Sequence, residues 1–286
     1  MDIGLLGALN VRENGVSIAP TAPKPRQLLA LLALRADQVV SVPTLVEEVW
    51  AGTPPRSART TLQTYVLQLR ELIATALREG AAPGQADARS AKDVLTTLPG
   101  GYLLVAQGGR SDIREFERLS EQGCRAMDDG NFAGASGILR RALDLWTGPP
   151  FADVPTGVHL GMEARRLEES RLCALDLRIE ADLRLGRHRE LLAELTVLTS
   201  RYRSHENLHA QFMLALYRSG RRGEALLVYQ QLRTHLVRDL GLEPSARLCR
   251  LQQSILTATA ENPGTPPHHD DDLAAPAPGG GLTRVP

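Results

Sequence analysis

Residues 56–73, RSARTTLQTYVLQLRELI, form the stretch that most restricts the fold of this chain. At about 100° per residue, one side of a helix through this stretch gathers the apolar positions Leu62, Val66, Leu69 and Ile73. The opposite side carries hydroxyl and amide groups where a solvated helix usually has Glu and Lys, namely on Thr60, Gln63, Thr64 and Gln68. The range from Val49 to Arg78 contains one acidic residue, Glu71, and four basic residues, Arg56, Arg59, Arg70 and Arg78. The stretch therefore predicts an amphipathic helix with a buried stripe and an outer face suited to a polyanion.

The segments around this helix predict a small sheet, three helices and a terminal hairpin. Short apolar runs at residues 3–6, 9–12 and 16–18 read as strands, and Asn14-Gly15 is a favoured pair for a tight hairpin turn. Helical periodicity follows at residues 28–34 and again at about residues 44–50, before Gly52, Pro54 and Pro55 interrupt it. Residues 94–97 and 102–105 form a hairpin around Pro99-Gly100-Gly101, after a small, polar segment, residues 79–92, that we expect to be mobile.

Residues 111–260 are almost wholly helical in pattern and contain a repeat. Three stretches, DDGNFAGASGILRRALDLW, RLGRHRELLAELTVL and RSGRRGEALLVYQQL, each place a Gly before a polar stretch and then a helix. Gly186 and Gly220 are 34 residues apart, which is the tetratricopeptide period, although ordinary helix hairpins with Gly caps would also fit. Residues 261–286 are rich in Pro and Gly and have little to bury, so we expect them to be disordered.

Composition limits the classes of function. The chain has 286 residues, which favours about two domains, and its net charge is zero, so a nucleic-acid surface would have to be local. We predict no membrane association, because no apolar run reaches the roughly 18 to 20 residues that span a bilayer. The three cysteines are widely spaced, without a CxxC pair, and the first ten residues do not resemble a signal peptide. These features favour reduced cysteines in a cytoplasmic protein.

The chain resembles the antibiotic regulatory proteins of actinomycetes, the SARP family of pathway-specific transcriptional activators. The resemblance covers about residues 1–257 and rests on several stretches in order: SVPTLVEEVWAGTPPRSARTTLQTYVLQLREL, TTLPGGYLL, DIREFERL, LWTGPPFADV and ALYRSGRRGEALLVYQQLRTHLVRDLGLEPSARLCRLQQSIL. It implies a mainly α fold with a small β component. An OmpR-like winged helix-turn-helix would occupy residues 1–110. A bacterial transcriptional activation domain, α-helical and tetratricopeptide-like, would occupy residues 111–260.

The resemblance also implies a function and its partners. A protein of this family is a sequence-specific activator that binds direct repeats in double-stranded promoter DNA, as a homodimer or as tandem protomers, and recruits RNA polymerase holoenzyme including its sigma factor. The pathway would be a secondary-metabolite, or antibiotic, biosynthetic gene cluster. We expect no enzymatic activity, no catalytic residue, no metal and no cofactor.

The winged-helix assignment makes the helix over residues 56–73 the recognition helix, which lies in the major groove. Short or amide-bearing side chains that reach base edges or phosphates are Thr60, Gln63, Thr64 and Gln68, and the bases that suit phosphates are Arg56, Arg59 and Arg70. Trp50 and Tyr65 are candidates for contacts with the DNA backbone, although each could equally pack on the hydrophobic core of the protein. Thr96 and Thr97 of the wing could contact phosphate or the minor groove, or be ordinary strand residues.

Two other functions compete with this interpretation. A tetratricopeptide adaptor whose N-terminal domain binds protein would share the repeat. A zinc hydrolase is suggested by His205-Glu206-Asn207-Leu208-His209, which matches H-E-x-x-H. A metzincin would continue with Gly and His where this chain has Phe212 and Ala215, so we expect a helix capped by Ser204 and no zinc. The acidic run His268 to Asp272 is interpreted as part of the polar tail rather than as a metal site.

Overall fold

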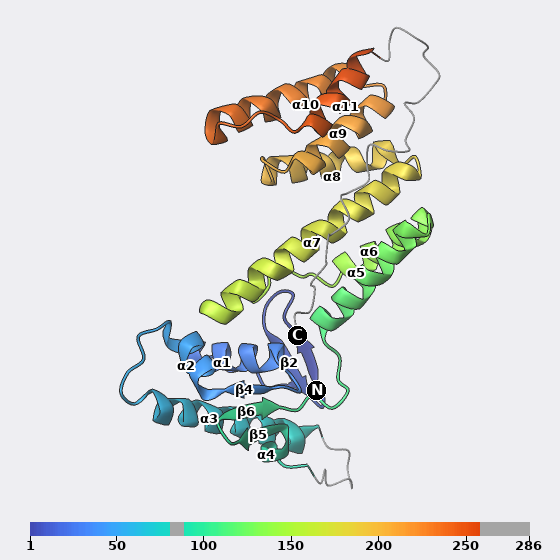
Figure 1. Ribbon diagram of the computed structural model, residues 1–286. Helices are drawn as coiled ribbons and strands as arrows, with labels where there is room; N and C mark the ends of the chain where they lie inside the picture. Colours follow the sequence, from blue (N-terminus) through green and yellow to red (C-terminus); the bar gives the residue numbers. More distant parts are fainter. Residues whose placement is uncertain (81–88, 258–286) are drawn as a thin grey trace, which may run out of the picture. The chain divides into compact units, whose positions relative to one another are not determined.

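The computed structural model describes residues 1–80 and 89–257. It divides into two compact units, one from Met1 to Ala181 and one from Asp182 onward (Figure 1). Most of residues 79–92, which we expected to be mobile, lie outside the described ranges. All of residues 261–286, which we expected to be disordered, also lie outside them. The fold is mainly α with small sheets, as the sequence predicts. No helix in the described ranges combines the length and the apolar character needed to cross a membrane.

The first unit opens with a three-stranded antiparallel sheet. Its strands are β1 (Asp2–Gly4), β2 (Asn10–Glu13) and β3 (Val16–Ser17), in the order β1-β2-β3. Asn14 and Gly15 both have positive φ, 49° and 81°, as a tight hairpin turn between β2 and β3 requires. The predicted strands and turn are therefore confirmed, with ends shifted by one or two residues.

Three helices form the core of the N-terminal part of this unit, namely α1 (Pro23–Leu34), α2 (Val42–Trp50) and α3 (Ala58–Glu79). α1 is buried on nearly all sides, since Leu28, Leu29, Leu31 and Leu32 are at most 1% exposed. α2 begins where the Ser41 hydroxyl accepts the backbone N–H of Thr44. It ends at Ala51, whose left-handed conformation stops the helix.

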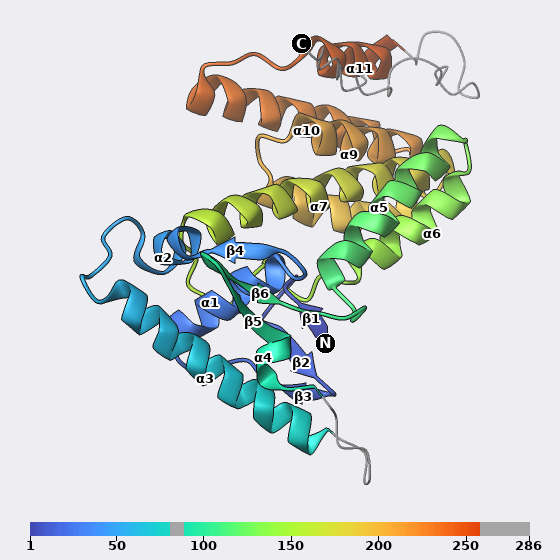
Figure 2. The same cartoon turned by 60° about the horizontal axis from the view of Figure 1, so that its bottom comes forward.

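A second three-stranded sheet carries the wing. Its strands are β4 (Val39–Ser41), β5 (Leu95–Leu98) and β6 (Gly101–Leu104), in the order β4-β6-β5, so the predicted hairpin is confirmed as β5 and β6 (Figure 2). Gly101 is required because a Cβ there would lie 2.5 Å from the carbonyl oxygen of Val40. β4 and the short helix α4 (Ala91–Val94) were not predicted, because each consists of only a few residues.

Helices α5 (Asp112–Asp128), α6 (Phe132–Leu143) and most of α7 (Val158–Arg184) complete the first unit. One hydrophobic core runs from the N-terminal strands through α3 to these helices, and within it Phe116 and Trp146 meet edge to face at 5.2 Å. The loop before β2 is bonded to the α6–α7 connection, where Thr147 N–H donates to Leu6 and Phe151 N–H to Leu5. Residues on either side of position 110 therefore share a single core.

The contact between α2 and the start of α7 is polar and buried. Glu48 on α2 is 1% exposed, and its carboxylate accepts the backbone N–H of Gly157 at 2.6 Å, His159 at 2.8 Å and Leu160 at 3.1 Å. These N–H groups belong to Gly157, which precedes α7, and to the first turn of α7, where the helix offers them no carbonyl acceptor. A side chain from the winged helix thus caps a helix of the following domain. Gln27 on α1 donates its amide to the same carboxylate.

The second unit contains α8 (His188–Arg201), α9 (Glu206–Arg218), α10 (Arg222–His235), the π-helical turn η1 (Leu236–Leu240) and α11 (Ala246–Thr257). Its core joins α9, α10 and α11 through buried residues such as Met213, Leu232 and Ile255. Gly186 and Gly220, at φ 79° and 82°, lie at the turns before α8 and α10. The 34-residue spacing therefore marks equivalent turns of successive helix hairpins, as a tetratricopeptide-like domain requires.

Candidate DNA interface

The buried side of α3 anchors this helix to the hydrophobic core. Its 22 residues include the predicted stripe, in which Leu62, Val66, Leu69 and Ile73 are each at most 2% exposed. Burying side chains of this size contributes about 1.5 to 3 kcal/mol each. The stripe leaves the opposite side of α3 facing solvent.

That opposite side presents a continuous polar face. Thr60, Gln63, Thr64 and Gln68 are all exposed, and Leu67 between them is 57% exposed. The Thr64 hydroxyl donates to the carbonyl of Thr60 at 3.2 Å, one turn back. Within residues 1–80 and 89–257, the amides of Gln63 and Gln68 have no recorded hydrogen-bond partner. A free amide matches the paired donor and acceptor of adenine in the major groove, and an apolar side chain matches the thymine methyl group.

Two of the predicted arginines border this face as free cations. Arg56 in the α2–α3 loop and Arg59 in the first turn of α3 are exposed. The described part of the chain offers neither guanidinium an acid or a carbonyl. Both guanidinium groups are therefore available to an anion, such as a phosphate, beside the N-terminal end of α3.

Arg70 lies differently from Arg56 and Arg59. Its Nε and Nη2 atoms donate to the carbonyl of Leu95 at 3.0 and 2.7 Å, and Nη2 also donates to the Thr97 hydroxyl at 2.8 Å. Leu95 and Thr97 belong to β5 of the wing. The guanidinium therefore ties α3 to the wing, a role that the sequence did not reveal.

The wing threonines are partly occupied by local bonds. Thr96 is half-buried and its hydroxyl donates to the carbonyls of Lys92 and Asp93. Thr97 is exposed and accepts from Arg70. Below them, the Ser90 backbone N–H and hydroxyl bond the Asp93 carboxylate, which lowers the pKa of Asp93. The wing base is thus held by its own side chains.

Trp50 and Tyr65 form an aromatic pair at the edge of the interface. Their rings are stacked at 6.3 Å with an interplanar angle of 15°, and both side chains are half-buried. Lys24 at the start of α1 places its ammonium group 5.1 Å from the centre of the Trp50 ring. Lys24 was not predicted as part of this site, because its contact with Trp50 depends on how α1 and α2 pack. Both side chains pack against the hydrophobic core, as one of the two alternatives expects, and a contact with the DNA backbone stays a prediction.

The H-E-x-x-H pattern has a structural role in α9. His205 itself is the N-cap, since its Nδ1 accepts the Leu208 N–H, so the expected cap at Ser204 is wrong. His209 is 7% exposed, and burial lowers its pKa. Among the residues that the structure describes, no three His, Cys, Asp or Glu side chains are grouped as a metal site.

The three-helix core, the wing and the polar outer side of α3 define a winged helix-turn-helix protein. The model of the bacterial transcriptional activator domain matches residues 111–256, and that of the C-terminal domain of transcriptional regulatory proteins matches residues 18–82. The chain belongs to the SARP-type transcriptional regulators, and it is a DNA-binding regulator rather than an enzyme.

Individual relatives support this assignment. Regulatory protein DnrI of Streptomyces peucetius is 53% identical over 90% of this chain and 93% of its own length. Regulatory protein AfsR of Streptomyces coelicolor is 37% identical over 89% of this chain, which spans only 24% of AfsR. The solved structure of Mycobacterium tuberculosis EmbR in complex with a low affinity phosphopeptide superposes with a TM-score of 0.80 at 32% identity, covering 90% of this chain and 65% of EmbR.

Proposed function

We propose that the chain activates transcription from promoters whose direct repeats it reads with the outer side of α3. The observation that carries this proposal is the row of exposed side chains from Thr60 to Gln68, in which two amides have no protein partner within the described ranges. Gln63 and Gln68 read base edges, and Leu67 contacts thymine methyl groups.

Phosphate contacts surround this row. Arg56, Arg59 and Lys24 supply the positive charge, and the Trp50–Tyr65 pair lies beside Lys24. Thr60, Thr64, Thr96 and Thr97 add hydroxyls for the DNA backbone. Arg70 acts mainly by holding the wing, because its donors are already directed at Leu95 and Thr97.

Each chain carries one recognition helix, so two protomers bind in tandem, head to tail, on two half-sites. Family membership supports direct rather than inverted repeats, with centres a whole number of helical turns apart, about 10 to 11 bp or a multiple. The test is an electrophoretic titration of DNA duplexes with the protein. Each duplex carries two copies of one half-site that the protein binds, in direct or in inverted orientation. Tighter binding to the direct repeat is expected, and preference for the inverted repeat would overturn the proposal.

The helical domain binds RNA polymerase holoenzyme, including its sigma factor, and recruits it to the promoter. The protein does this in the cytoplasm, at the promoters of a secondary-metabolite gene cluster. Tetratricopeptide-like stacks offer extended surfaces for protein partners. Isolated arginines of the second unit are weak candidates for these contacts, because Arg221 and Arg233 pair with Glu224 and Glu243. The carbonyls of Ile255 and Leu256 likewise occupy the Arg222 guanidinium.

A fragment tests this division of labour. A fragment ending at Arg110 would expose the core around Phe116 and remove the partners of Glu48, so the better boundary is Arg184, the end of α7. We expect residues 1–184 to occupy the promoter in a footprint but to leave run-off transcription by purified polymerase at its basal level. Full activation by this fragment would contradict the proposed role of the remaining helices.

A further inference from the structure

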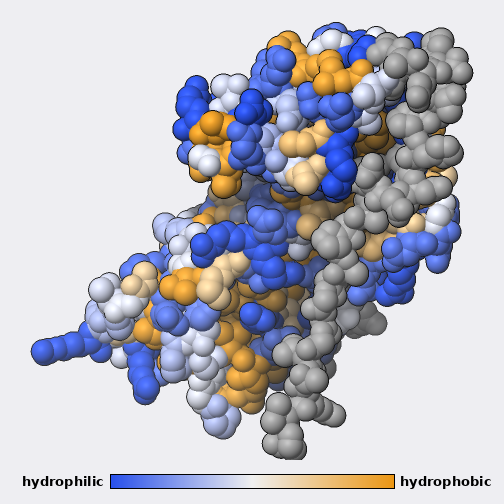
Figure 3. Space-filling view, turned by 45° about the horizontal axis from the view of Figure 1, so that its top comes forward, coloured by the Kyte–Doolittle hydropathy of each residue, from blue (hydrophilic) through white to orange (hydrophobic). Residues whose placement is uncertain are grey.

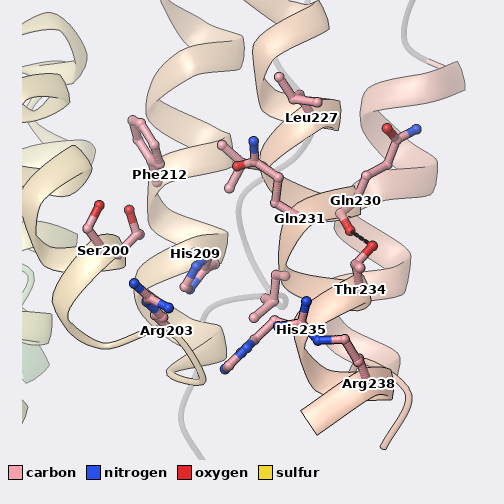
Figure 4. A pocket seen from close by; sticks show the side chains of 13 residues that line it. Ser200, Arg203, His209, Phe212, Leu227, Gln230, Gln231, Thr234, His235 and Arg238 are labelled. Carbon is pink, nitrogen blue, oxygen red and sulfur yellow. Dashed lines mark hydrogen bonds between the residues drawn. The ribbon is translucent and has the colours of Figure 1, made fainter.

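The first unit contains a groove that the proposed DNA interface does not use. It lies between α5 and α7, has a volume of about 800 Å³, and is lined by two exposed thiols, Cys124 and Cys173. Hydropathy marks no separate docking surface on the face in Figure 3, where hydrophobic and hydrophilic residues are interspersed. A cavity of about 580 Å³ between α8, α9 and α10 has no cysteine among its described lining residues (Figure 4). The two thiols therefore distinguish the α5–α7 groove.

The two cysteines occupy equivalent positions on helices that run in the same general direction (Figure 1). An ion pair across the groove fixes the register, because Nη2 of Arg166 donates to Oε1 of Glu117 at 2.7 Å. Cys124 follows Glu117 by seven residues, and Cys173 follows Arg166 by seven residues. Seven residues make about two turns of an α-helix, or about 10.5 Å. Each cysteine therefore lies on the same side of its helix as the ion pair, and the two thiols lie opposite one another.

Short side chains separate the ion pair from the thiols. Ser120 and Ser170 line the groove at this level, and Ala174 next to Cys173 is only 3% exposed. The Ser170 hydroxyl donates to the carbonyl of Arg166 at 3.0 Å, on its own helix. Side chains of this size leave room for the two helix backbones to approach each other. A disulfide needs such an approach, because its Cβ atoms lie about 3.8 Å apart.

The electrostatic surroundings keep both thiols protonated at neutral pH. Burial and the carboxylate of Asp128 raise the pKa of Cys124, and the neighbouring sulfur of Cys173 raises it further. Burial and the carboxylates of Asp176 and Glu169 raise the pKa of Cys173. The influence of one sulfur on the other agrees with the helix register, which makes the cysteines neighbours. Because the thiolate is the nucleophile, the raised pKa values make both cysteines slow to react at neutral pH.

We propose that Cys124 and Cys173 form a reversible disulfide when the protein meets a hydroperoxide. One thiolate attacks a peroxide oxygen and becomes a sulfenic acid as hydroxide leaves, and the other thiolate then displaces the sulfenic hydroxyl as hydroxide. Each hydroxide takes up the proton of one thiol. Two thiols and hydrogen peroxide thus give one disulfide and two waters, with two electrons passing from sulfur to oxygen. A dithiol reductant reverses the reaction by thiol–disulfide exchange.

The disulfide strengthens the junction between the helical domain and the winged helix. Cys124 and Cys173 are 49 positions apart, so the bond closes a loop that contains α6 and the α6–α7 connection. The N–H groups of Thr147 and Phe151 in that connection bond the loop before β2. Closing a loop of this length lowers the conformational entropy of the unfolded chain. Oxidation therefore stabilises the part of the first unit that carries these bonds.

The experiment maps the disulfide in the full-length chain. Reduced wild type, Cys124→Ser, Cys173→Ser and Cys249→Ser are treated with hydrogen peroxide, alkylated and digested with trypsin, and the peptides are analysed by mass spectrometry without reduction. The expected product links residues 119–125, LSEQGCR, to residues 172–178, LCALDLR. Cys249→Ser is the matched control, because Cys249 lies in the second unit and contacts the Tyr229 hydroxyl. It should form the same bond, and the other two variants should not.

Two further measurements follow the bond itself. Oxidation should raise the melting temperature of wild type and of Cys249→Ser by roughly 5 to 10 °C, and dithiothreitol should reverse the rise. The melting temperatures of Cys124→Ser and Cys173→Ser should not change with peroxide. The rate of disulfide formation should increase about tenfold from pH 7 to pH 8, because the thiolate fraction does so well below the pKa.

Four results would overturn the proposal. Oxidation of both cysteines to sulfinic acids without the linked peptides would mean that the sulfurs do not reach each other. A link between the same peptide of two chains would make the bond intermolecular. A link to residues 248–250, which contain Cys249, would assign a different pair. An unchanged melting temperature of oxidised wild type, with the linked peptides present, would exclude the stabilising effect.

Discussion

The α2–α7 contact and the outer side of α3 are both polar, yet they differ in how their polar groups are satisfied. Glu48 is buried and accepts hydrogen bonds from three backbone N–H groups, on Gly157 before α7 and on His159 and Leu160 in its first turn. Gln63 and Gln68 are exposed and have no protein partner within the described residues. A buried polar group with all its bonds made maintains a structure, whereas a row of exposed unpaired amides is free for a ligand. A substitution of Glu48 should therefore lower the stability of the fold. Substitutions of Gln63 and Gln68 should instead lower the affinity for DNA and leave the stability unchanged.

Glu48→Ala should have the largest effect, on stability. It leaves buried N–H groups of α7 and the Gln27 amide without their acceptor, so we expect a loss of roughly 2 to 5 kcal/mol in the free energy of unfolding. Urea denaturation followed by circular dichroism measures it. Glu47→Ala is the matched control, because the exposed Glu47–His159 pair contributes less than about 1 kcal/mol. Equal effects of the two substitutions would refute the capping role.

Gln63→Ala and Gln68→Ala should leave unfolding within about 0.5 kcal/mol of wild type, as surface substitutions do. Each should weaken binding to the selected promoter site by roughly 1 to 3 kcal/mol if it reads a base. Fluorescence anisotropy with labelled duplex measures the affinity. Gln38→Ala, another exposed glutamine of the winged helix, serves as the control and should bind like wild type.

The arginines distinguish a phosphate contact from a positioning contact. Arg56→Ala and Arg59→Ala should each reduce the slope of log affinity against log salt by about one and should leave the melting temperature unchanged. Arg70→Ala should instead lower the melting temperature, because it frees β5 from α3. Titrations at several salt concentrations, paired with thermal denaturation, separate the two patterns. A salt slope reduced by Arg70→Ala with no change in melting temperature would assign Arg70 to phosphate.

A smaller effect concerns pH. Burial tends to raise the pKa of Asp153, but the Leu9 N–H and the Arg26 guanidinium outweigh it and lower the pKa below its usual value. A carboxyl whose folded pKa is depressed stabilises the fold above its unfolded pKa and loses that contribution as pH falls. The stability advantage of wild type over Asp153→Asn should therefore be present at pH 6 and shrink below about pH 4. An advantage that does not change with pH would exclude this contribution.

The sequence predicted those parts of the site that depend on local periodicity. The apolar residues from Leu62 to Ile73 repeat at helical spacing, so they predicted helix α3 and its buried side. The side opposite to this stripe was therefore predicted to be exposed. The partners of Glu48 at the start of α7 lie more than 100 positions away, and no local pattern connects them with it. Arg70 looked like a surface base because its spacing says nothing about the strand that passes beside it. Lys24 was missed for a similar reason, since its contact with Trp50 depends on how α1 and α2 pack.

Base specificity is the most direct test of the claim that the outer side of α3 reads DNA. Wild type, Gln63→Ala and Gln68→Ala are titrated against the selected half-site and against half-sites with one base pair changed at a time. We expect a change at a base pair that α3 reads to weaken wild-type binding by roughly 1 to 3 kcal/mol. Each variant should become indifferent at one of those pairs while keeping its preference at the others. Unchanged preferences at every base pair in both variants would contradict the assignment of α3 as the reader.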